Sequence, residues 1–141
     1  MSSTLMRHLA RRLLAVEAAS QSATDAHLHE AVRVCEKLRI SLTRFAGSEG
    51  FRSLLRRALA LARAEVPSVQ TVKLKPDGSL EGLDVLAVDV MNGGPEAAVA
   101  ITAHLLGLLV TFIGEALTLR LVREAWPGGS LDEQSRRIEA L

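Results

Sequence analysis

The sequence predicts an all-α fold: a single helical bundle built around one hydrophobic C-terminal helix at about 95–126. The stretch from Ala97 to Leu119 is apolar around the whole circumference of a helix, so other structure must cover it. Three earlier segments carry apolar residues at helical spacing. The composition is 48% hydrophobic but only 3% aromatic, which leaves most of the packing to Leu and Ala, two good helix formers. The bundle is therefore expected to wrap three amphipathic helices around the apolar one.

The three amphipathic helices are predicted at 4–19, about 25–45 and 48–66. Each has an apolar residue at every third or fourth position, which gives one buried face. Gly47 separates the second helix from the third, because glycine adopts the left-handed dihedrals that end a helix. Pro67 ends the third. The length of 141 residues fits one domain, 1–141, and we expect its ends, 1–3 and 128–141, to be flexible.

A short β-hairpin is predicted near 69–82. Alternating side chains at 69–74 indicate one strand, and 79–82 indicates the second. The four residues between them, Lys-Pro-Asp-Gly, are typical of a tight turn. Residues 84–91 are ambiguous, with a short helix as one interpretation. Pro95 then suits the first turn of the long helix.

Two rows of residues recur along the long helix at intervals of seven. Glycine inside a helix costs about 1 kcal/mol relative to alanine, and close approach of another backbone is the usual compensation. We therefore expect a close-packing seam formed by Ala100, Gly107 and Gly114. Beside it we expect a buried polar seam formed by His104, Thr111, Glu115 and Thr118.

Glu115 is the acidic residue in the otherwise apolar stretch 97–119 of this helix. A buried carboxylate must be paired or protonated, so we expect Glu115 to pair with an arginine of the N-terminal helices. The alternative is that Glu115 and His104 face a small ligand or an enzymatic site.

The apolar helix allows three environments. It can be the core of a soluble bundle, it can cross a membrane, or its small residues can make a symmetric dimer contact. Its uncharged run, 97–113, has 17 residues, which is short for a bilayer span of roughly 20. The soluble core is therefore preferred, and a membrane contact is the less favoured alternative.

Charge is divided unevenly along the chain. Residues 1–66 hold eleven Lys and Arg against six Asp and Glu, a net charge of +5, and residues 67–141 hold six against ten, a net charge of −4. Such polarity suits an acidic partner or head-to-tail association. The predicted interaction surface consists of helix-borne cations: Arg52, Arg56, Arg57, Arg63, Lys37 and Arg44.

The sequence carries no phosphate-binding loop, dinucleotide fingerprint, nucleophile elbow or zinc-protease motif. His27, His29 and Glu30 lie within one turn, which is too few ligands for a metal site, so we expect neither a metal nor another cofactor. Cys35 falls on an apolar helix face, where a thiol is inert, and a lone cysteine excludes an internal disulfide. These observations, with no apolar leader segment, lead us to expect a cytoplasmic protein.

The leading functional hypothesis is a non-enzymatic interaction or adaptor domain that binds an acidic protein, or itself as a homodimer, through the arginine face. Nucleic acid is a less suitable partner, because no nucleic-acid-binding module is present and few aromatic side chains are available for stacking. The alternatives are a membrane-active protein that exposes its apolar helix, and a ligand or enzymatic site around Glu115 and His104.

Overall fold

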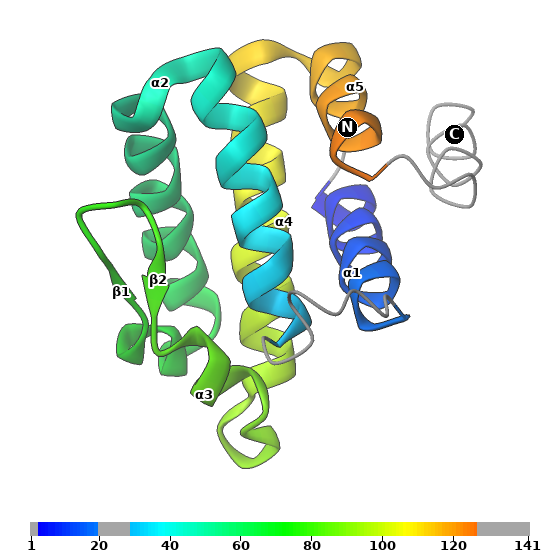
Figure 1. The fold of residues 1–141 in the computed structure, drawn as a ribbon. Coiled ribbons are helices and arrows are strands. Elements are labelled where there is room, and N and C mark those ends of the chain that lie inside the picture. Colours follow the sequence, from blue (N-terminus) through cyan, green and yellow to red (C-terminus); the bar gives the residue numbers. More distant parts are fainter. Residues whose placement is uncertain (1–2, 20–28, 127–141) are drawn as a thin grey trace.

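Helix α4 (Gly94–Ile113) lies at the centre of the structure, with α1 (Ser3–Ala19) and α2 (Glu30–Glu65) packed along it (Figure 1). The predicted all-α bundle around an apolar helix, with a small antiparallel hairpin, is confirmed. The other elements are η1 (Pro67–Thr71), β1 (Lys73–Leu74), β2 (Leu80–Glu81), α3 (Leu83–Ala87), η2 (Val90–Asn92) and α5 (Glu115–Ala125).

The structure is a computed structural model, and it describes residues 3–19 and 29–126. The termini that we expected to be flexible, 1–3 and 128–141, lie outside the described residues, except that Ser3 begins α1.

Helix α2 contains the two predicted helices, which meet at a kink. Gly47 has φ 79° and ψ 165°, a conformation that breaks the helical path. On either side of it lie a first arm (30–46) and a second arm (48–65), which run in opposite directions (Figure 1). The helix break predicted at Gly47 is therefore present at that residue.

The prediction of one continuous helix at about 95–126 is wrong. The helix is divided at Gly114, whose φ of 89° and ψ of 160° are not helical, and α5 turns back from this point (Figure 1). Thr118 donates a hydrogen bond of 2.8 Å to the carbonyl oxygen of Gly114 and so supports the first turn of α5. Glu115 suits this turn as well, because an acidic side chain is favourable at the positive end of a helix.

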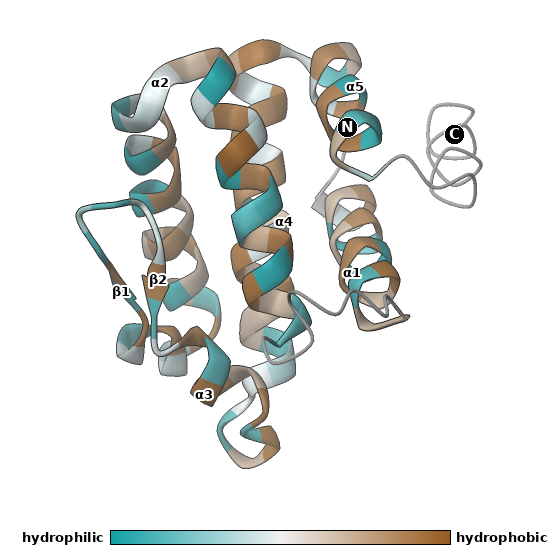
Figure 2. Cartoon of the chain, viewed as in Figure 1, coloured by the Kyte–Doolittle hydropathy of each residue, from teal (hydrophilic) through white to brown (hydrophobic). Residues whose placement is uncertain are grey.

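The core is formed by the facing apolar stripes of these helices. Side chains of α4 such as Leu105 and Leu109 are buried together with Leu9 of α1 and Leu38 and Leu55 of α2. In Figure 2 the parts of α4 that are visible behind the first arm of α2 are mainly brown and pale, in keeping with its apolar sequence. By length and composition α4 could cross a membrane, and half of its most apolar window is buried inside the bundle.

The hairpin is shorter than predicted. Leu74 pairs with Leu80, and Lys73 with Glu81, so each strand has two residues. Val69, predicted to lie in the first strand, is a buried residue of η1 instead. Pro67 explains the difference, since its fixed φ begins the 3-10 turn that carries Val69 into the core. The ambiguous segment after the hairpin contains the short helix α3.

Candidate functional site

The second arm of α2 presents a basic surface. Arg56, Arg57 and Arg63 are exposed, and we call them the basic face. Within residues 3–19 and 29–126, none of the three makes an ion pair with a carboxylate. Arg56 and Arg63 are seven residues apart, so they lie on nearly the same line along the helix. The structure therefore brings together half of the surface that the sequence predicted.

The other predicted members lie elsewhere or are engaged. Arg52 is half-buried and bonds to Glu49 at 2.6 Å. Arg44 is exposed on the first arm, across the kink from the basic face. Lys37 is turned inward to Glu17. Prediction from helical spacing could not anticipate this division, because the kink and the partners of each cation depend on tertiary packing.

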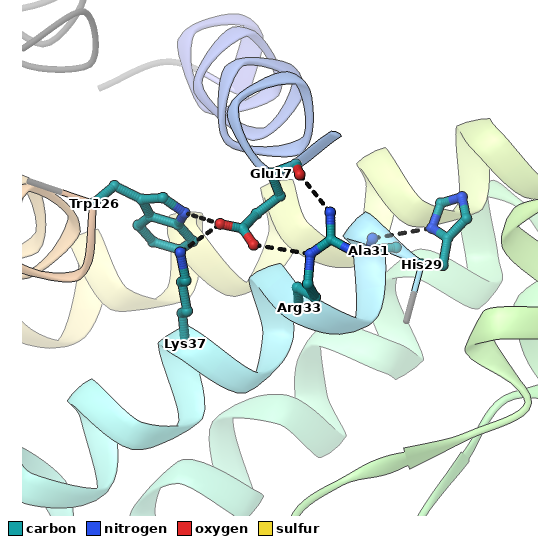
Figure 3. Close-up of polar contacts among 6 residues, drawn as sticks. All are labelled: Glu17, His29, Ala31, Arg33, Lys37 and Trp126. Atoms are coloured by element: carbon teal, nitrogen blue, oxygen red, sulfur yellow. Dashed lines mark hydrogen bonds and ion pairs between the residues drawn. The ribbon is translucent and has the colours of Figure 1, made fainter. Parts of the chain in front are cut away.

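A buried ion cluster surrounds Glu17 at the end of α1 (Figure 3). Its side chain is 2% exposed and accepts bonds from Arg33 at 3.1 Å, Lys37 at 2.5 Å and the Trp126 indole N–H at 3.0 Å. Arg33 also donates to the backbone carbonyl of Glu17, and the Lys37 ammonium lies 5.5 Å from the centre of the Trp126 ring. The cluster thus joins α1 and α2 to Trp126, which directly follows α5.

The carboxyl of Glu17 keeps its charge despite its burial. Burial raises its pKa, but the hydrogen bonds from Lys37, Trp126 and Arg33 together outweigh this effect, and its pKa lies below the ordinary value. Sequence reasoning missed this acid and assigned the buried carboxylate to Glu115. The available signal was position, because Glu17 falls four residues after Leu13 on the apolar stripe of the first helix.

A second polar cluster lies at the junction of α1, α2 and α4. Glu65 accepts a hydrogen bond from Arg7, and the same oxygen lies 3.3 Å from His104 Nε2. The Arg7 bond is the main cause that lowers the pKa of Glu65; burial opposes it, and the bond to His104 adds to the lowering. The cluster borders an open cavity of about 220 Å³, lined by Met6, Arg7, Leu61, Ala103, His104, Gly107, Leu108 and Thr111.

The predicted seams are only partly realised. Thr111 and Glu115 are exposed and His104 is half-buried, so Thr118 is the buried member of the polar seam. Ala100 is fully buried, but a Cβ atom added at Gly107 or Gly114 would meet no atom within 4 Å. Neither glycine serves close packing. Gly107 borders the cavity, and Gly114 supplies the left-handed turn that ends α4.

An apolar loop projects from the end of the bundle (Figure 1). It spans residues 83–92, comprising α3 and η2, and we call it the apolar loop. Its exposed side chains are Val85 (70%), Val88 (65%), Val90 (74%) and Met91 (93%). The sequence predicted only an ambiguous segment at 84–91, with a short helix as one interpretation. It did not predict that these apolar side chains are exposed.

Two other residues that the sequence singled out, His29 and Cys35, have structural explanations. His29 caps α2 by accepting a bond of 3.0 Å from the Ala31 amide, whereas His27 lies outside the described residues. Among the residues that the structure places, no group of three metal-ligating side chains is found. Cys35 is buried, and burial raises the pKa of its thiol to about 12.

No known protein family, curated protein or solved structure matches the chain.

Proposed function

We propose that this protein is an interaction domain that binds an acidic segment of a protein partner through the basic face. The observation that supports this proposal is the state of Arg56, Arg57 and Arg63, which are exposed and have no carboxylate partner in the described chain. Arg7 and Arg33, by contrast, are paired with acids. An arginine carries five N–H donors that match a carboxylate in geometry, so three on one helix suit a run of Asp or Glu.

Capture of a labelled poly-glutamate peptide tests this function. We expect the full chain to bind the peptide, with an affinity that falls as salt is raised. The variant Arg56→Glu/Arg57→Glu/Arg63→Glu should bind at least about tenfold more weakly, because reversed charge repels the probe. Equal capture by the triple variant and the natural sequence would reject the basic face.

The matched control is Arg11→Glu/Arg44→Glu/Arg120→Glu. These three exposed residues lie on α1, the first arm of α2 and α5, so the control carries the same net charge without touching the basic face. It should retain most of the capture. Far-UV circular dichroism verifies that both triple variants keep the helical content.

A second candidate function, binding of a small carboxylate, rests on the cavity beside His104. Its volume of about 220 Å³ is large enough to admit a small organic molecule. Its apolar lining suits a short hydrocarbon chain, and the guanidinium of Arg7 at its border offers N–H donors beyond the one bonded to Glu65. Hexanoate fits both requirements.

Amide chemical shifts recorded during a hexanoate titration test the second candidate. Shifts should concentrate around Gly107 and His104 and should disappear in Gly107→Leu, whose side chain fills the cavity. Ala60→Leu, on the exposed surface of α2, is the control. Equal shifts with hexylamine, or none with hexanoate, would exclude this site.

A further inference from the structure

The apolar loop is a prearranged surface. Leu83, Leu86 and Ala87 anchor its first half in the core. A Cβ atom on Gly94 would lie 1.7 Å from the Leu86 carbonyl oxygen, so the start of α4 packs tightly against α3. Asp89 accepts bonds from the backbone and side-chain nitrogens of Asn92 and so fixes the turn between them. Four large apolar side chains are thus held in water on a fixed framework, which is typical of a surface that contacts another macromolecule.

Most of the charged residues in and beside this loop are negative, although Lys73 lies opposite Glu81 in the hairpin and Arg11 lines a cavity together with Ala87. Glu81, Asp84, Asp89 and Glu96 lie in or beside it, and the sequence holds no Lys or Arg between Lys75 and Arg120. Within the described part of the chain, none of these four acids pairs with a cation. An anionic membrane or a nucleic acid would be repelled by this surface. The partner must therefore combine apolar contact with positive charge.

The basic face of α2 has this combination. Between and beside its arginines lie three exposed apolar side chains: Ala60, Leu61 and Ala64. Small side chains at the centre allow a projecting Val or Met to approach the helix, while the surrounding guanidinium groups reach carboxylates at the edge of the contact. One chain therefore carries two surfaces that complement each other and that form no ion pair with each other in the described structure.

We propose that the apolar loop of one copy docks on the basic face of a second copy. This inference rests on the proposed function, and it identifies the acidic partner as another molecule of the same chain. Each contact joins unlike surfaces, so two copies make the contact twice if a two-fold axis relates them, and otherwise association continues head to tail.

Sedimentation velocity of the full chain, from micromolar to sub-millimolar concentration, tests the inference. The average sedimentation coefficient of the natural sequence should rise with protein concentration, and added salt should weaken the association. The loop variant Asp84→Arg/Glu96→Arg and the triple arginine variant should each associate at least about tenfold more weakly. Val90→Ser/Met91→Ser should weaken association too, because it removes apolar contact without changing charge.

Charge exchange provides the decisive comparison. In a mixture of the loop variant and the triple arginine variant, the unaltered loop still matches the unaltered basic face, and the reversed loop and the reversed face also carry opposite charges. Association should therefore return in the mixture, and also in one chain that carries all five reversals. The variant Arg44→Glu/Arg120→Glu, which spares Arg11 because that residue lines a cavity with Ala87 of the apolar loop, should associate like the natural sequence.

Two results would overturn the inference, and they separate it from the proposed function. A chain that stays monomeric throughout, yet captures poly-glutamate through its arginines, retains the proposed function and loses the second copy as partner. Association that is unchanged in the loop variant also contradicts the docking of this loop. Equal capture of poly-glutamate by the natural sequence and by the triple arginine variant, by contrast, would remove the proposed function itself.

Discussion

The indole N–H of Trp126 donates a 3.0 Å hydrogen bond to the carboxylate of Glu17, a residue 109 positions earlier in the chain. Arg33 and Lys37 bond to the same carboxylate from the first arm of α2. One buried side chain thus joins the first helix, the second helix and the end of the last described helix. A group with three charged or polar partners is costly to remove, since each partner loses its bond at once.

Glu17→Ala should destabilise the protein by about 3 kcal/mol, because it leaves the buried Arg33 guanidinium without its carboxylate. Urea denaturation followed by circular dichroism measures the change. Glu49→Ala is the control, since it removes an exposed ion pair with Arg52 and should cost less than about 1 kcal/mol. A similar loss in both variants would mean that the buried cluster contributes no more than a surface pair.

The same cluster gives stability a dependence on pH. The pKa of Glu17 is lower in the folded protein than its ordinary value of 4.5, so its ion pairs contribute fully above about pH 4.5 and are lost as pH falls through the depressed folded-state pKa. The free energy of unfolding of the natural sequence should therefore decrease as the solution is acidified below pH 4.5. Glu17→Gln cannot titrate and should show a smaller decrease over the same interval. Parallel curves for the two proteins would contradict this assignment.

Cys35 should be unreactive in the folded protein. Its thiol is buried, and burial raises its pKa to about 12, so almost no thiolate is present at neutral pH. In native buffer, a thiol reagent should modify Cys35 only as fast as the helix opens. In denaturant, it should react at the rate of a free cysteine. Rapid labelling in native buffer would mean that the α2 core is open in solution.

Helical periodicity predicted the architecture because burial repeats along each helix. The stripes that placed Leu38 and Leu55 in the core depend only on local spacing, and both side chains are buried. Gly47 could be predicted as a break because polar residues follow it. Gly114 could not, since the apolar pattern resumes directly after Glu115 and a glycine is compatible with either a helix or a turn.

The candidate site was less accessible to such reasoning. Spacing placed Arg56 and Arg63 on one helix face, but it could not show that Lys37 turns toward Glu17. Glu17 and its partners come from three separate segments, and no local pattern joins them. Exposed residues such as Met91 were missed because local spacing does not show which apolar side chains of a short loop stay exposed.

Gly107 and Gly114 offer a matched test of where helix α4 ends. A Cβ atom meets nothing within 4 Å at either position, so an alanine fits both sites without steric conflict. Gly107 lies inside the helix, and Gly107→Ala should stabilise the protein by about 1 kcal/mol through helix propensity. Gly114 has φ 89°, a conformation that side chains rarely adopt, so Gly114→Ala should cost about 1–3 kcal/mol. Thermal denaturation of the two variants should shift in opposite directions. If Gly114→Ala proved as stabilising as Gly107→Ala, the helix would continue through residue 114, and the turn that carries α5 back to the bundle would be wrong.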